Sequence, residues 1–335
     1  MQELYDRYSK GLRRCVDRVY ADGSDADLAD RFRANVSRFA AYKADYVKTT
    51  VNNILNDASI PLKQRQEMAD AAVAGFDRYS EAECNTATSR CRTAKQWKEF
   101  NDPQRLRLFP NLRWIGTRSA NPRQTHLQFA DKVWAKDDDF WNKNMPGQEW
   151  NCKCDLEETD DPVTDNSEVE AKTKDAKAPL GLEGNPAKTG EIFTDRAGYV
   201  KNARNEATTS IIRCVRQYNR DLYANINTNV ETEIGSILID KITVQEVTKG
   251  AATDASYFLK QEIALHIDNY VPLLKALTNE AIDLSHNNHK SIFYQRKKLF
   301  KTMKVYELEV NGYKFQVKMG EFQDGSLNLY AITEP

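Results

Sequence analysis

The chain has 335 residues, which is more than one hydrophobic core usually serves, so two domains are expected. Forty per cent of its residues are hydrophobic and 29% are charged, a composition that excludes fibrous and wholly disordered proteins. The 48 Lys and Arg residues nearly cancel the 49 Asp and Glu residues, which excludes binding of nucleic acid through overall charge. Any such binding must be local.

The first twenty residues, "MQELYDRYSKGLRRCVDRVY", carry charges every few positions and contain no apolar core typical of a secretory signal. No run approaches the roughly 18 to 20 apolar residues that span a bilayer, so no membrane partner is expected. The six cysteines are scattered rather than dense. These features predict a protein kept in a cytoplasm with its cysteines reduced.

Residues 1–102 are predicted to be a helical module, folded as an antiparallel bundle or hairpin. Apolar residues recur every three or four positions from Leu28 to Tyr46 and form one stripe along a helix. Ser59 and Pro61 are typical of the start of a second helix. A further helix is expected from Ser80 to about residue 100.

Residues 103–158 have a different texture, with aromatic residues, Pro, Gly and short polar runs. Four of the five tryptophans lie here, but helical periodicity is weak. Such a segment must be held by aromatic packing, side-chain hydrogen bonds or a bound ion, because regular ladders do not satisfy its backbone.

Residues 159–190 are first acidic and then mixed, with Pro and Gly, and are predicted to be a flexible linker. Residues 191–335 are predicted to form an α+β domain in which helices precede an antiparallel sheet. Helical patterns cover 196–226 and 256–284. A hairpin is expected around Asn311-Gly312, and a further strand follows the turn at Asp324-Gly325.

Four ordered motifs occur between residues 91 and 155: "CRTAKQWKEF", "FPNLRWIGTRSANPRQTH", "DDDFWNKNMPGQEW" and "NCKCD". Their order and spacing resemble the phage Mu F-like head morphogenesis family, the minor capsid proteins of tailed phages and prophages. The chain departs from that pattern at Asp139, where Pro is usual before Phe140-Trp141, and at Cys91, where a small residue is common. The resemblance implies a minor structural component near the portal, taken up with the scaffold during procapsid assembly. Its implied locations are the virion and, during assembly, the host bacterial cytoplasm.

His126, Cys152 and Cys154 are of residue types that can bind metals, and the family pattern also places them together. Two thiolates separated by one residue can bind zinc, with the histidine as a third ligand. A bound zinc ion would contribute folding free energy and so stabilise this irregular, aromatic-rich segment. The alternatives are plain packing of the thiols and, less favoured, redox chemistry. The candidates for a fourth ligand are Asp131, Asp137, Cys84 and Cys91, although the last two are interpreted first as small core residues.

The C-terminal part contains a basic and aromatic run from His286 to Lys318. Such a surface neutralises phosphates and stacks bases, so RNA or DNA is an alternative partner. The residues assigned to nucleic-acid binding are Lys290, Lys297, Lys301, Lys304, Tyr294 and Tyr313. The layout also resembles phage-encoded nuclease domains of the barnase, EndoU, colicin and RelE-like type.

A metal-independent ribonuclease needs a base, an acid and cations for the phosphate. By this chemistry, His286 or His289 would act as base or acid, and Arg296, Lys298 and Lys318 would bind phosphate. The alternative interpretation is that the histidines are solvated and that the lysines protect a sheet edge.

The sequence therefore supports two hypotheses. The favoured one is a minor head protein that assembles with the portal and other head or scaffold proteins and is not an enzyme in residues 1–160. The other is the same head protein carrying a C-terminal RNase or DNase that acts as a toxin or effector. The two hypotheses differ only in the last third of the chain.

Overall fold

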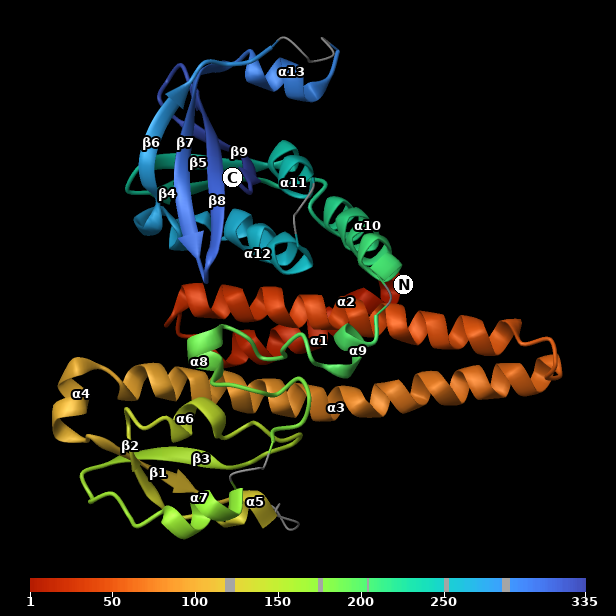
Figure 1. Ribbon diagram of the computed structural model, residues 1–335. Coiled ribbons are helices and arrows are strands. Elements are labelled where there is room, and N and C mark those ends of the chain that lie inside the picture. Colours follow the sequence, from red (N-terminus) through yellow and green to blue (C-terminus); the bar gives the residue numbers. More distant parts are fainter. Residues whose placement is uncertain (118–123, 174–176, 204, 250–252, 285–289) are drawn as a thin grey trace. The chain divides into compact units, whose positions relative to one another are not determined.

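The computed structural model describes residues 1–117, 124–173, 177–203, 205–249, 253–284 and 290–335. The chain contacts divide it into two compact units, which we call unit 1 (Glu3–Ala203) and unit 2 (Arg204–Pro335) (Figure 1). A helical N-terminal part is followed by a C-terminal part with helices and a sheet, which confirms the predicted fold class. Within the described ranges, none of the helices combines the length and apolar character that a membrane span requires.

Three long helices form the frame of unit 1: α1 (Gln2–Val19), α2 (Ala26–Asn56) and α3 (Leu62–Phe100). Figure 1 shows α2 and α3 as a hairpin joined by a short turn, as the sequence predicted. The break expected before Ser80 is absent, and α3 runs on as one helix. Its later turns bury Ala87, Cys91, Ala94 and Trp97, so tertiary packing supports the helix where the sequence pattern changes.

A buried ion pair joins the two helices of the hairpin. Lys43 Nζ on α2 lies 2.6 Å from Glu83 Oε2 on α3, and the Lys43 side chain is inaccessible to solvent. The same ammonium group donates to the Phe76 carbonyl and to Ser80 Oγ. Tyr199 donates its hydroxyl hydrogen to the other Glu83 oxygen. Burial lowers the pKa of Lys43 and raises the pKa of Glu83, so each charge is held only by its partners.

Removing one charge of this pair will therefore destabilise unit 1. We expect Lys43→Met or Glu83→Leu alone to cost about 3–5 kcal/mol of unfolding free energy, because each leaves a buried charge unpaired. The double variant should recover most of that loss. Urea unfolding followed by tryptophan fluorescence measures this, since all five tryptophans lie in unit 1.

Lys48→Met, an exposed change on the same helix, is the control and should leave the urea midpoint nearly unchanged. Single variants that unfold at the same urea concentration as this control would show that the ion pair contributes nothing.

Residues 103–159 form a small sheet that the sequence did not predict. Strands β1 (Asn111–Ile115), β2 (Val133–Ala135) and β3 (Asp155–Thr159) pair in the order β2-β1-β3, with both pairings antiparallel. The short helix α4 (Pro103–Leu108) precedes β1, and the short helices α5 (Gln124–Leu127) and α6 (Phe140–Lys143) lie in the connections between the strands. The strands are too short and too aromatic to show a clear alternation in the sequence.

Aromatic packing, one of the three possibilities that the sequence left open, forms the core of this part. The Trp134 and Phe140 rings stack 3.9 Å apart, and Trp114 lies parallel to Trp141 with ring centroids 6.3 Å apart. Phe129 meets Trp114, Trp134 and Phe140 edge to face. Trp114, Trp134 and Trp141 are fully buried, so these rings replace the long ladders that the segment lacks.

The segment predicted to be a flexible linker is instead part of unit 1. It contains α7 (Ser167–Thr173) and α8 (Pro186–Thr189), and α9 (Gly198–Lys201) follows it. Arg90 on α3 donates to the carbonyl oxygens of Leu182, Glu183, Gly184 and Glu191. Leu182, Ile192 and Phe193 are buried. The prediction of a linker over 159–190 is wrong for its described residues, and unit 1 continues to Ala203.

Unit 2 contains a six-stranded sheet in the order β4-β5-β9-β8-β7-β6. Its strands are β4 (Asn227–Thr232), β5 (Gly235–Asp240), β6 (Lys275–Glu280), β7 (Phe300–Val310), β8 (Tyr313–Phe322) and β9 (Leu327–Thr333). The sheet is mixed rather than purely antiparallel, because β5 pairs with β9 in parallel.

The helices of unit 2 are α10 (Asn205–Leu222), α11 (Lys241–Val247), α12 (Asp254–Leu265) and α13 (Ile292–Lys297). Two 3-10 turns, η1 (Ile267–Asn269) and η2 (Val271–Leu273), follow α12. The predicted hairpin is confirmed: Asn311 and Gly312 both have positive φ and join β7 to β8. The prediction of helix over 256–284 is correct only to Leu265, where α12 ends; two 3-10 turns follow, and β6 then pairs with β7.

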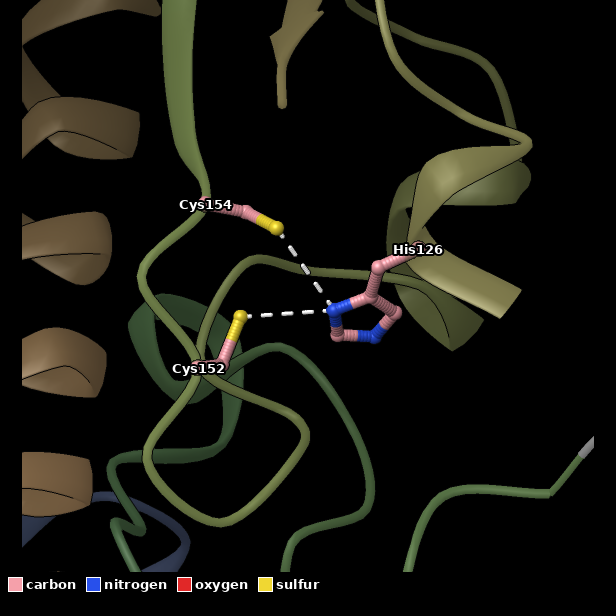
Figure 2. A group of neighbouring side chains, drawn as sticks. All are labelled: His126, Cys152 and Cys154. Carbon is pink, nitrogen blue, oxygen red and sulfur yellow. Dashed lines mark hydrogen bonds between the residues drawn. The ribbon is translucent and has the colours of Figure 1, made fainter. Parts of the chain in front are cut away.

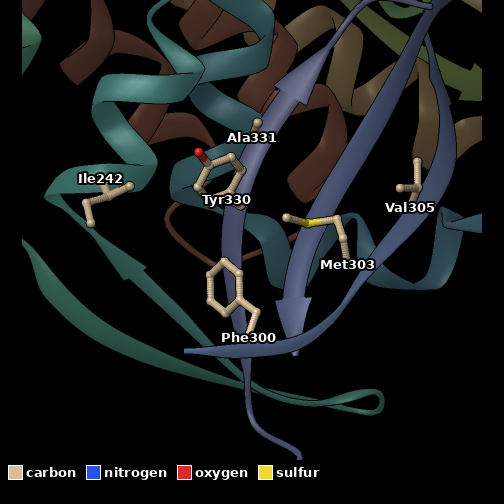
Figure 3. Close-up of a cluster of buried hydrophobic side chains, with 6 residues drawn as sticks. All are labelled: Ile242, Phe300, Met303, Val305, Tyr330 and Ala331. Carbon is tan, nitrogen blue, oxygen red and sulfur yellow. The ribbon is translucent and has the colours of Figure 1, made fainter. Parts of the chain in front are cut away.

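One hydrophobic cluster of unit 2 joins helix α11 to the sheet. Figure 3 shows Ile242 with Phe300, Met303, Val305, Tyr330 and Ala331, all of them buried. Gly320 on β8 allows Phe300 to approach, since a Cβ atom there would lie 2.3 Å from the Phe300 ring. Phe300 also packs edge to face on Tyr330.

Candidate metal centre

His126, Cys152 and Cys154 lie together in unit 1. His126 Nδ1 is 3.3 Å from Cys152 Sγ and 3.6 Å from Cys154 Sγ (Figure 2). The three candidate ligand atoms lie within 4.8 Å of one another. His126 and Cys154 are buried and Cys152 is half-buried. The structure thus brings together the three residues that the sequence singled out.

The small sheet explains how residues so far apart in sequence meet. Ile115 at the end of β1 pairs with Asp155 at the start of β3, so Cys154 lies just outside that end of the sheet. His126 lies on α5, in the connection from β1 to β2. Its ring packs edge to face on Trp114, with ring centroids 5.4 Å apart. Both arms of the cluster are therefore anchored in the aromatic core.

The surroundings of the two sulfur atoms favour a thiolate. The pKa of Cys152 is lowered, first by the hydrogen bond from Cys154 and then by His126 and the Gly147 backbone N–H. The pKa of Cys154 is raised, because its proton is held between the two sulfurs and because it is buried. Thiolates are the form in which cysteine binds metal.

The donor set fits a zinc ion. Two sulfurs and one imidazole nitrogen are ligands that zinc takes in tetrahedral sites. The buried Trp114 Nε1 makes no hydrogen bond of normal geometry within the described ranges, yet it lies near enough to Cys154 to favour the thiolate form. With the Thr117 backbone N–H, it would donate to a metal-bound sulfur. The geometry fits both a metal ion and plain packing of the thiols, and both stay predictions.

None of the four residues that the sequence named as a possible fourth ligand belongs to this cluster. Among the described residues, the cluster contains only His126 and the two cysteines. Asp131 and Asp137 are exposed elsewhere, and Cys91 is buried within the helices. Cys84 lies against Cys15 of α1. Cys152 and Cys154 also line a polar hollow, so this side of the cluster is open to solvent.

The residues predicted to form a nuclease site are not gathered among the described parts of unit 2. His286 and His289 lie outside the described residues. Arg296 on α13 forms an ion pair with Asp240, the buried N-cap of α11, which is a structural use of its charge. Lys298 is exposed after α13. Lys318 on β8 lies opposite Val305 of β7.

The predicted nucleic-acid surface is also divided. Lys304 pairs with Met319 in the register and lies 3.1 Å from Glu321, whereas Lys318 belongs to the opposite face of the sheet. Lys297 lies over the Tyr330 ring and donates to the Asp283 carbonyl. Tyr294 is buried beneath Lys298, Tyr313 stacks on Phe315, and Lys290 and Lys301 are exposed. The nucleic-acid assignment stays a prediction.

Sequence reasoning missed several residues that build the centre. Gly147 has a φ of +89°, and a Cβ atom there would lie 2.8 Å from Arg90 Cγ, so only glycine lets this turn approach α3. Gln148 donates to the Gly184 carbonyl and accepts from the Met145 backbone N–H. The Pro-Gly-Gln order at 146–148 was a signal for a tight turn of this kind.

Comparisons of this chain with protein-family models, with curated proteins and with solved structures found no match. The interpretation of the centre therefore depends on its own geometry and on the motif series in the sequence.

Metal binding gives a direct prediction. We expect the purified chain to contain about one zinc ion, and His126→Ala, Cys152→Ser and Cys154→Ser each to weaken zinc binding more than about tenfold. Zinc at 100 times its dissociation constant should stabilise unit 1 by about 2.7 kcal/mol. Elemental analysis and thermal unfolding with and without chelator measure both effects.

Cys214→Ser in unit 2 is the matched control and should leave zinc content unchanged. A chain that purifies without metal, and whose unfolding temperature responds to neither zinc nor chelator, would favour plain packing of the thiols.

Proposed function

We propose that this chain is a minor head protein of a tailed phage or prophage, which acts by binding other proteins during procapsid assembly near the portal. The motif series from Cys91 to Asp155 supports the proposal, because its described residues form one packed body rather than scattered segments. The proposed locations are the virion and the host cytoplasm during assembly.

An apolar hollow of about 500 Å³ in unit 1 carries the proposal. It is lined mainly by aromatic and small residues: Phe39, Tyr79, Ala82, Glu83, Trp150, Leu180, Ala197, Gly198 and Tyr199. Exposed apolar surface at a pocket is typical of a place where a partner inserts an anchor residue. Tyr79 is 60% exposed and Leu180 44% exposed, so part of the wall faces solvent.

The walls of this hollow are held rigidly. Phe193 stacks on Phe39 with ring centroids 4.1 Å apart, and Trp150 stacks on Phe193 with ring centroids 5.8 Å apart. Tyr199 meets Phe39 edge to face. Glu83 lies at the hollow with its charge compensated by Lys43, so the site suits an apolar side chain rather than a second cation. A rigid pocket of this kind lowers the entropy cost of binding.

Filling the hollow tests the proposal. We expect the chain to bind the portal or scaffold protein encoded in the same phage genome, and Ala82→Trp to weaken that binding at least tenfold, because the new ring would occupy the pocket. Ala71→Trp, an exposed change on the same helix, should have little effect. Co-purification followed by calorimetric titration measures the difference, with circular dichroism to verify folding.

If no portal, scaffold or major head protein binds the full chain, the assembly proposal is wrong. Equal binding by the two tryptophan variants would instead remove the hollow as the contact surface.

The alternative of a C-terminal nuclease stays a prediction, since Arg296 is engaged with Asp240 and both predicted histidines lie outside the described residues.

A further inference from the structure

A second hollow in unit 1, of about 620 Å³, is polar and lies beside the metal centre. Helix α1, helix α3, the end of β1 and residues 151–155 form its walls. Cys152 and Cys154 belong to the lining, so the hollow opens onto two of the three candidate ligands. It is separate in composition from the apolar hollow described above, because the two share no lining residue.

Three basic side chains converge on this hollow from three parts of the chain. Arg18 comes from the end of α1, Arg92 from α3, and Lys153 from the segment between the two cysteines. All three are exposed, and no ion pair or hydrogen bond engages their side chains within the described ranges. Asp155 is the one acidic residue of the described lining. The fold thus gathers three cations against one carboxylate without pairing them.

The rest of the polar lining consists of neutral hydrogen-bonding groups: Asn85, Thr88, Ser89 and Asn151. Asn85 donates to the Asn151 side chain at 3.1 Å, which joins α3 to the cysteine segment across the hollow. The Asn151 backbone N–H donates to Thr86 Oγ1 on the same helix. These contacts fix the segment that carries Lys153. The fold therefore sets the backbone position from which Lys153 reaches the hollow.

We propose that this hollow binds a phosphate group. A phosphate group carries up to two negative charges and several acceptor oxygens, which matches an excess of two cations surrounded by hydroxyl and amide donors. Arginine presents a planar fork of N–H donors that suits phosphate, and two of the three cations are arginines. The three cations repel one another in the free protein. An anion bound between them would remove this unfavourable electrostatic energy.

The adjoining thiolates do not oppose an anion when zinc is bound, because the charges of two thiolates and one Zn²⁺ sum to zero. The phosphate could belong to a small phosphate compound or to the backbone of a nucleic acid. Both share the chemistry that the hollow recognises. The inference is independent of the proposed head function and of the basic run in unit 2.

The test uses the full chain with two probes. Pyrophosphate is titrated by calorimetry, and a fluorescein-labelled single-stranded oligonucleotide is titrated by fluorescence anisotropy at low salt. The variant is Arg18→Gln with Arg92→Gln. The control is Arg14→Gln with Lys98→Gln, which removes the same charge from exposed positions on the same two helices outside the hollow.

We expect the hollow variant to bind at least one probe ten or more times more weakly than the parent, and the control to stay within about twofold. If the oligonucleotide occupies the hollow, the salt dependence of its binding should also fall, by a slope of about 1.4 for two lost contacts. Zinc content and urea midpoint are measured for each protein, so that a loss of folding is recognised.

Weaker binding of both probes would assign the hollow to the phosphate group itself. Weaker binding of pyrophosphate alone would assign it to small phosphate compounds, and of the oligonucleotide alone to a nucleic-acid backbone. If neither probe binds the parent, or if hollow variant and control bind equally, the proposal is overturned.

Discussion

Arg90 is fully buried on α3, and its guanidinium donates hydrogen bonds to four main-chain carbonyl groups of residues 182–191. Burying a guanidinium is costly, and burial lowers the Arg90 pKa to about 10, so the charge remains at neutral pH. Only several well-placed acceptors offset that cost. These hydrogen bonds hold residues 182–191 in one position against α3. The turn at Gly147 packs against the same Arg90 side chain.

Both surfaces to which we assign binding depend on this arrangement. Trp150 and Cys152 follow the Gly147 turn, so the wall of the apolar hollow and the floor of the polar hollow are set by one contact with α3. Leu180, Ala197 and Tyr199 flank the segment that Arg90 holds. The metal ligands then need little further ordering, because His126 is fixed by Trp114 and Cys154 by its place before β3. A zinc ion at this position would lock an arrangement that packing has already produced.

The sequence predicted the elements that depend on local residue patterns. It failed where contacts between segments distant in the sequence determine the structure. The helices of the hairpin, the Asn311-Gly312 turn and the trio of ligand-type residues follow from spacing and residue type. Arg90 was missed because an arginine on a helix normally faces solvent. Residues 159–190 resemble a linker by composition, and the sequence did not show that Arg90, about ninety residues earlier, binds the main chain near their end. Strand β6 continues an apolar helical pattern, and only pairing with β7 makes it a strand.

The central claim is that α3, the aromatic sheet and residues 182–193 unfold as one cooperative body. Native-state hydrogen exchange of the full chain, followed by mass spectrometry of peptides from α3, β3 and residues 182–193, tests it most directly. We predict the same opening free energy for the most protected amides of all three regions, and a joint loss of protection of β3 and residues 182–193 in Arg90→Met. Exchange of residues 182–193 at the rate of a free peptide, while α3 and β3 stay protected, would contradict the account.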